Sequence, residues 1–163
     1  MNRFASLRAT RQALARGWNW FFHAPADGRI CAAIRIVYAS LVLMHLAVLY
    51  PDLDRWFTAA GLLPYDLSRE TASVYTWTLL GWLPDTSAAV QAAFWVAVGH
   101  AVALLIGLLP RVNAFFLFLW IVSFQVRNTI INDGEDVLLR LLGFFMIWLP
   151  SGRSWSVNSL MWH

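Results

Sequence analysis

The sequence VNAFFLFLWIVSFQVRNTIINDGEDVLLRLLGFFMIWLP, residues 112–150, decides the fold of this chain. Two apolar runs, 112–126 and 137–149, flank a short segment that carries arginine, asparagine, aspartate and glutamate side chains. A charge at the middle of a bilayer costs about 2.5–3.5 kcal/mol on insertion scales, so charges inside spans are usually functional. This polar segment is therefore either a hydrated loop between two spans or a site.

The composition of the whole chain predicts an integral membrane protein. Of its 163 residues, 60% are hydrophobic and 13% are charged, whereas about 25% of the residues in a soluble domain are charged. The ten tryptophans and eleven phenylalanines fit this class, because aromatic side chains collect at membrane interfaces. The chain contains no lysine, which excludes a lysine base or Schiff base. Its single cysteine, Cys31, excludes an internal disulfide.

The apolar runs predict an all-α integral membrane protein with a four-transmembrane-helix bundle. A span needs about 20 mostly apolar residues to cross a hydrocarbon core of about 30 Å. Prolines end three of the runs, because proline interrupts the hydrogen bonds of a helix. The expected transmembrane domain covers residues 30–160, with spans at about 30–50, 88–109, 112–131 and 133–150.

Two segments outside the spans have predicted places at the membrane surface. Residues 1–29 are expected to form an amphipathic segment on the cytoplasmic face. The long outer loop, 51–87, contains an apolar piece at 74–83 that is too short to span, and it predicts a short helix in the outer interface or a re-entrant piece. The arginine distribution places both termini in the cytoplasm by the positive-inside rule. We expect a bacterial inner (cytoplasmic) membrane location.

A polar layer is predicted near the outer ends of the spans. Three carboxylates within four residues can hold a hard cation or a proton. The other interpretation is helix capping, with Asp133 as N-cap and Asp136 as its capping-box partner, and we predict no metal. Arg140 lies one turn inside the last span, and Asp136 is its expected ion-pair partner. The candidate polar layer comprises His45, Arg127, Asn128, Asn132, Asp133, Glu135, Asp136 and Arg140.

Arg35 and two histidines are further candidates within the spans. Arg35 is close to the inner end of the first span, so it either extends to the inner interface or is buried against a polar group or lipid headgroup. His45 and His100 differ in expected depth by roughly 12 Å at 1.5 Å per residue, which argues against a shared haem. His45 instead lies near the expected depth of Asp136 and Arg140. No cofactor is predicted, although a quinone or lipid fits the layer.

Six short motifs follow one another in a characteristic order. They are Trp20-Phe21-Phe22 with Pro25-x-Asp27-Gly28-Arg29, Ala33-Ile34-Arg35-Ile36, Trp56-x4-Gly61-Leu62-Leu63-Pro64, Gly107-Leu108-Leu109-Pro110-Arg111, Arg127-Asn128-x3-Asn132-x-Gly134-x-Asp136-Val137-Leu138-Leu139-Arg140, and Leu149-Pro150-x-Gly152-Arg153-x-Trp155-Ser156-Val157-Asn158. With these motifs, residues 18–160 resemble the horizontally transferred transmembrane (HTTM) domain family, whose best-known relatives are the vitamin K-dependent gamma-carboxylases.

The resemblance implies the transmembrane fold of that family and a membrane location, for the N-terminal half of a member. In the carboxylases, a lysine shortly before the fifth motif activates the vitamin quinol, and the equivalent position here is near Asn128. Since this chain has no lysine, the resemblance does not imply gamma-carboxylation. The closing motif carries Asn158 where the family usually has aspartate.

Two functions follow as expectations. The first is a non-catalytic role as a small membrane subunit or accessory protein of a larger membrane complex, with the lipid bilayer and other membrane-protein subunits as partners. The alternative is a membrane enzyme or redox helper that binds a quinone or lipid headgroup at the outer polar layer. The arginines of the first seventeen residues are typical of a cytoplasmic flank, so we expect no nucleic-acid partner.

Overall fold

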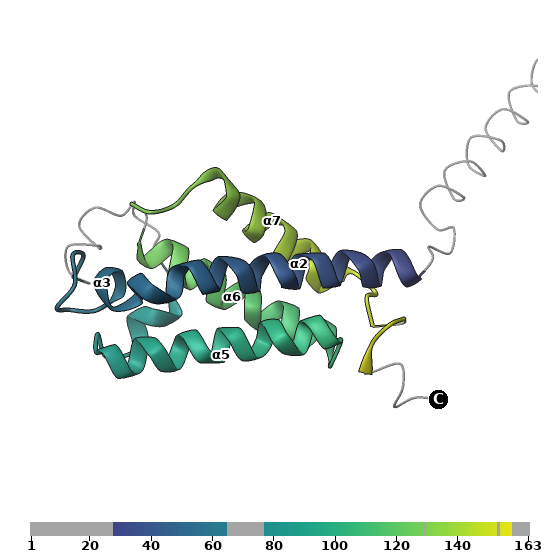
Figure 1. Ribbon diagram of the computed structural model, residues 1–163, viewed down its shortest axis with the longest axis horizontal. Helices are drawn as coiled ribbons and strands as arrows, with labels where there is room; N and C mark the ends of the chain where they lie inside the picture. Colours follow the sequence, from purple (N-terminus) through teal and green to yellow (C-terminus); the bar gives the residue numbers. More distant parts are fainter. Residues whose placement is uncertain (1–27, 65–76, 129, 153, 158–163) are drawn as a thin grey trace, which may run out of the picture.

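Four long helices form the described part of the protein. The computed structural model describes residues 28–64, 77–128, 130–152 and 154–157, and it contains no strand within these ranges. The helices are α2 (Gly28–Leu49), α5 (Ser87–Ile106), α6 (Pro110–Arg127) and α7 (Gly134–Trp148). The helices α2 and α5 run along the long axis of the molecule, and α7 is inclined to it (Figure 1). The prediction of an all-α fold is therefore confirmed, while the predicted amphipathic segment lies almost wholly outside the described residues.

Two of the helices are long and apolar enough to cross a membrane by length and composition. They are the helical stretch Gly28–Phe57, which begins with α2, and α5, which covers Ser87–Ile106. The helix α7 has only 15 residues, or about 22 Å at 1.5 Å per residue. The helix α6 has 18 residues, with polar side chains near both ends. The chain thus has two apolar helices that suggest a membrane protein.

The helix boundaries follow from local chemistry. Pro51 ends the α-helical part of the first stretch, which continues as a 3-10 turn, η1 (Tyr50–Asp52), and a short helix, α3 (Leu53–Phe57). Gly107 ends α5 in the left-handed conformation at φ 75°, where glycine has no steric penalty. Pro110 then opens α6 at a position where a missing N–H costs nothing.

The third helix is shorter than the sequence predicts. We expected a span over 112–131, but α6 ends at Arg127 because Asn128 adopts an extended conformation at φ −135°. In the outer loop, the expected helix at 74–83 is a four-residue 3-10 turn, η2 (Leu79–Trp82), in its described part, and residues 74–76 lie outside that part. Thr78 holds η2 against α6, since its Oγ1 donates to the Ser123 carbonyl at 3.0 Å.

Small side chains allow α2 and α5 to pack closely. Ala32 and Ala39 of α2 and Ala97 and Ala101 of α5 are all completely buried, and small residues let helix backbones approach one another in membranes. Larger side chains fill the centre of the bundle around this contact, including Val42, Leu46, Phe94, Leu104, Leu117, Ile121 and Phe124. The core therefore lies between α2, α5 and α6, with α7 added on one side.

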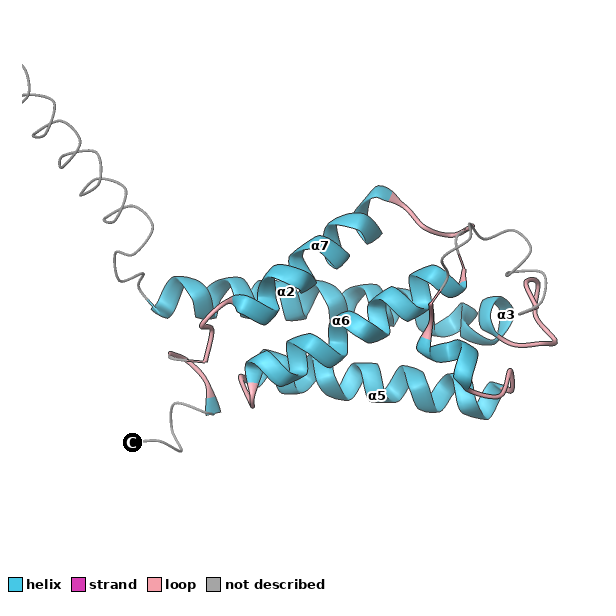
Figure 2. Ribbon diagram, turned by 180° about the vertical axis from the view of Figure 1, so that it is seen from behind, coloured by secondary structure: helices cyan, strands magenta, loops and turns pink. Residues whose placement is uncertain are grey.

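The helix α7 is close to α2 at one end and diverges from it at the other. Near its middle, the Tyr38 hydroxyl of α2 donates to the Leu139 carbonyl at 3.3 Å. A Cβ added to Gly143 would lie 2.5 Å from the same hydroxyl, so glycine permits this approach. Toward its N-terminus, the axis of α7 inclines away from that of α2 in both ribbon views (Figures 1 and 2), while the first turn of α7 keeps its contact with Gln125 of α6. The divergence leaves room between α2 and the acidic start of α7.

Candidate functional site

The acidic start of α7 is a capping box, as the sequence predicts. Asp133 is the N-cap, and Asp136 is at the third helical position. The Asp133 N–H donates to Asp136 Oδ2 at 2.8 Å, which satisfies one of the backbone donors that a helix leaves unpaired at its start. This hydrogen bond holds one carboxylate oxygen of Asp136 against the backbone at the start of α7.

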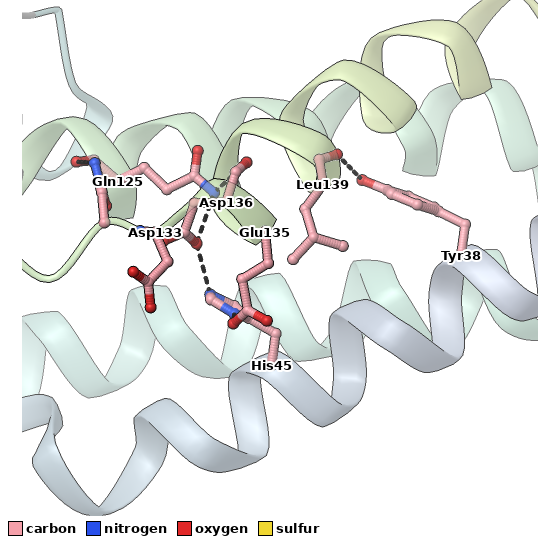
Figure 3. Close-up of polar contacts among 8 residues, drawn as sticks. Tyr38, His45, Gln125, Asp133, Glu135, Asp136 and Leu139 are labelled. Carbon is pink, nitrogen blue, oxygen red and sulfur yellow. Dashed lines mark hydrogen bonds and ion pairs between the residues drawn. The ribbon is translucent and has the colours of Figure 1, made fainter.

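The second carboxylate oxygen of Asp136 lies among side chains from two other helices. Gln125 of α6 donates through Nε2 to Asp136 Oδ1 at 3.1 Å and to the Asp136 carbonyl at 3.0 Å. His45 of α2 places its Nε2 3.5 Å from the same Oδ1. Figure 3 shows the side chains of His45 and Gln125 reaching Asp136 from opposite sides. Asp136 is thus a buried junction of α2, α6 and α7, with 7% of its side chain exposed.

The predicted ion pair between Asp136 and Arg140 is wrong. Within the described residues, no carboxylate lies within ion-pair distance of Arg140. The local spacing does allow the pair, but the Asp136 carboxylate turns toward the start of its helix and toward α6. Burial of Asp136 against Gln125 outweighs a pair between two residues of the same helix.

His45 lies between two carboxylates of different exposure. Its Nδ1 is 3.9 Å from Glu135 Oε1, and the Glu135 side chain is 72% exposed. Its Nε2 is 3.5 Å from Asp136 Oδ1, which is longer than a well-formed hydrogen bond. The imidazole retains 23% of its side-chain exposure. The two ring nitrogens of His45 therefore face two different carboxylates of the first turn of α7.

These side chains form the polar floor of a groove between α2 and α7. We call it the α2–α7 groove, and its volume is about 560 Å³, within the usual range for small-molecule sites. It opens on the side of the bundle, because Met44, Val48 and Leu138 on its walls are 63%, 74% and 54% exposed. The lining residues are Leu41, Met44, His45, Val48, Leu49, Asp52, Trp56, Ile131, Asp133, Glu135, Asp136, Leu138 and Leu139.

Three residues of the predicted polar layer lie at the end of α6 or in the connection to α7 and do not line the groove. Arg127 is 2% exposed; it donates to the Leu63 carbonyl at 3.1 Å and pairs with Asp85 at 3.3 Å. Asn128 accepts from the Ile130 N–H at 3.1 Å, and Asn132 donates to the Gln125 carbonyl at 2.8 Å. Their contacts hold the outer loops in place around the groove.

Arg35 occupies a separate buried site at the other end of the bundle. It is 0% exposed, so of the two predicted alternatives the structure fits burial against polar groups and not extension to the interface. Its guanidinium donates to the carbonyls of Ser151 at 2.7 Å and Trp155 at 2.5 Å and lies against Gly107 at the end of α5. A cation is favoured at the C-terminus of a helix, where carbonyls are unpaired. Arg35 therefore joins the ends of α5 and α7.

The two intrahelical histidines have different partners. His100 of α5 places Nδ1 2.8 Å from Asn113 Oδ1 of α6 and stacks on Phe116, whereas His45 lies beside the carboxylates of α7. In the described ranges, no group of three or more histidine, cysteine, aspartate or glutamate side chains could hold a metal ion.

Several residues of the site are absent from the sequence-based prediction. Gln125 was assigned to an apolar run, although a single amide within such a run is itself a signal of an internal hydrogen bond. Asp52 and Trp56 of the first outer loop line the groove, and Asp85 pairs with Arg127. No local pattern identifies these three, because the contacts join segments far apart in sequence.

Comparison of the chain with protein-family models, curated proteins and solved structures found no match.

Proposed function

We propose that this protein is a four-helix integral membrane protein whose α2–α7 groove binds a ligand from the bilayer. In this arrangement α2, α5, α6 and α7 all cross the membrane, with both chain termini in the cytoplasm of a bacterial cell. The acidic start of α7 then lies at the outer surface. The resemblance to the carboxylase-like transmembrane family supports the same arrangement, as does the arginine distribution.

The ligand that fits best has an apolar tail and a polar head, as a quinone or a phospholipid does. The walls of the groove carry mostly aliphatic side chains that are exposed at the side of the bundle, where lipid tails would lie in the proposed arrangement. Its floor carries His45 and Asp136, which can donate to or accept from a head group. The single observation that supports this proposal is that a contact between the partly exposed His45 and the buried Asp136 lies at the base of a cavity open to the side.

The proposed chemistry is binding with proton exchange at the head group. In this proposal a ring nitrogen of His45 accepts a hydrogen bond or a proton from a bound hydroxyl, and Glu135 and Asp136 lie 3.9 Å and 3.5 Å from the ring. Gln125 and the Asp133 N–H fix the carboxylate of Asp136, so its position does not depend on the ligand. We do not propose gamma-carboxylation, because the chain has no lysine to serve as the base.

The test is a titration of the purified protein in nanodiscs with short-chain ubiquinone and menaquinone analogues and with a brominated phosphatidylcholine. Quenching of Trp56, measured against a Trp56→Phe variant, reports entry into the groove. We expect saturable binding of at least one probe and a loss of at least tenfold in affinity in His45→Gln. The control variant Asp54→Asn changes a carboxylate outside the groove lining and should bind like the unchanged protein. Linear, non-saturating quenching with every probe would contradict the proposal.

A second candidate function is that of a small subunit or accessory protein of a larger membrane complex. The outer face of α7 carries large apolar side chains: Leu141 is 53%, Phe145 57% and Trp148 70% exposed. Such a face fits either lipid or a neighbouring helix. Purification in a gentle detergent, followed by identification of all associated proteins, tests this role. A monodisperse monomer without any associated protein would argue strongly against it.

A further inference from the structure

Arg140 is a cation within the apolar helix α7. Asp136, the ion-pair partner that the sequence predicts for it, contacts other residues. Arg140 lies six residues after Gly134, the first residue of α7, and therefore about 9 Å along the helix from Gly134 and about 6 Å from Asp136. Its Nε is buried and makes no hydrogen bond. An ionisable side chain at membrane depth normally faces a partner, so this arginine requires an explanation.

The nearby carboxylates are already engaged. Asp136, one turn away, accepts from Gln125 and from the Asp133 N–H and faces His45. Glu135 faces His45 at 3.9 Å. Within the part of the chain that the structure describes, no other acidic side chain approaches Arg140 within 4.0 Å. Arg140 is also absent from the lining of the α2–α7 groove, so a ligand in that groove does not supply the anion.

The helix face beside Arg140 is apolar and uncovered. Val137, three residues before it, is 58% exposed, and Phe144, four residues after it, is 45% exposed. Residues at these spacings are neighbours on a helix surface. A partner that covers this face must therefore be mostly apolar and carry one anionic group at the level of Arg140.

We propose that α7 is a docking surface for a transmembrane helix of another protein that carries an aspartate or glutamate opposite Arg140. A carboxylate on a helix reaches this depth, whereas lipid phosphates lie at the headgroup level marked by the acidic turn of α7. The buried Nε holds the inner part of the side chain against the protein. The inference rests on the proposed subunit role and is independent of ligand binding in the groove.

The test uses a designed leucine-rich transmembrane peptide with one glutamate at the depth of Arg140. Full-length protein and peptide, each carrying one dye, are reconstituted in phosphatidylcholine vesicles at pH 8, and energy transfer reports their association. Peptides with glutamine or leucine at the same position are the matched controls. We expect the glutamate peptide to associate at least tenfold more tightly than the glutamine peptide.

Variants show whether Arg140 causes this preference. Arg140→Gln should abolish it, and Arg140→Glu should instead prefer a peptide with arginine at that position. The exposed Arg55, whose side chain is 63% exposed, provides the control variant Arg55→Gln, which should behave like the unchanged protein. His45→Gln, which impairs the groove, should also leave the peptide preference unchanged.

Three results would overturn the inference. They are equal association of the glutamate and glutamine peptides, a preference that persists in Arg140→Gln, and loss of the preference when phosphatidylglycerol replaces phosphatidylcholine. The last result would assign Arg140 to anionic lipid. If the peptide preference is absent while the purified protein still carries an associated subunit, the docking inference fails and the proposed subunit role stands.

Discussion

At the scale of single residues, burial decides which charged groups pair with one another. Asp136 and Arg140 have the spacing of a helical ion pair, yet Asp136 contacts Gln125 and His45 instead. Arg35 is buried against backbone carbonyls rather than extended to the membrane surface. In both cases the partner is a group that only the fold brings near. Sequence spacing therefore suggested the wrong partner for Asp136 and left two alternatives open for Arg35.

The Asp136 carboxylate should contribute measurably to stability. Asp136→Ala removes the acceptor of the Asp133 N–H and one acceptor of Gln125, which should lower the free energy of unfolding by about 1–3 kcal/mol. Asp136→Asn keeps an oxygen acceptor and should cost less. Thermal unfolding in detergent measures both variants. Glu135→Ala, at an exposed position, is the control, and an equal loss there would refute a specific role for Asp136.

Arg35 should stabilise the fold through its contacts at the ends of α5 and α7. Arg35→Met keeps most of the side-chain volume but leaves the carbonyls of Ser151 and Trp155 without their donor. An unpaired buried group costs about 1–3 kcal/mol, so the loss of both donors should lower the free energy of unfolding by roughly 2–5 kcal/mol. The matched variant Arg55→Met changes an exposed arginine and should cost less than about 1 kcal/mol. Similar melting temperatures for the two variants would contradict this role.

At the scale of elements, hydropathy and proline positions predicted the four long helices well. The boundaries of α5 and α7 differ from the expected spans by at most a few residues, because helix starts and stops are local signals. The early end of α6 at Arg127 was missed, since the apolar pair Ile130–Ile131 extends the hydrophobic run beyond the helix. The capping box was predicted correctly because its two residues, Asp133 and Asp136, lie within one helical turn of each other.

The approach of α2 and α7 should depend on Gly143. A Cβ at this position would lie 2.5 Å from the Tyr38 hydroxyl, so Gly143→Ala must displace that side chain. We expect a destabilisation of about 1–3 kcal/mol, measured by thermal unfolding. Gly99→Ala is the matched control, because nothing lies within 4 Å of its added Cβ, and it should be neutral or stabilising by up to about 1 kcal/mol. The reverse order of the two effects would disprove the contact.

At the scale of the whole molecule, the groove could not be predicted from the sequence. The carboxylates of α7 and His45 were assigned to one polar layer, but the layer divides into a groove floor, a loop scaffold around Arg127, and the separate Arg140. That division depends on the angle between α2 and α7, which no local pattern encodes. Asp52 and Trp56 join the groove only because the first stretch continues as α3 beyond Pro51.

The proposed orientation in the membrane predicts opposite accessibility of the two ends of the bundle. In a Cys31→Ala background, cysteine replaces Trp82, which is 74% exposed at the predicted outer end, or Leu109, which is 53% exposed at the predicted inner end. A membrane-impermeant maleimide should label Trp82→Cys in intact cells and Leu109→Cys only after permeabilisation. Labelling of Leu109→Cys in intact cells would show that this end of the bundle faces outward, which contradicts the proposed topology.

The most direct test of ligand binding is photocrosslinking in membranes with an azido-quinone probe, followed by peptide mapping. We expect crosslinks to concentrate on the two walls of the groove, at residues 41–49 and 131–139, and to fall at least tenfold in His45→Gln. Crosslinks spread evenly over the exposed faces of α5 and α6, or an unchanged yield in His45→Gln, would contradict the claim that the α2–α7 groove is the binding site.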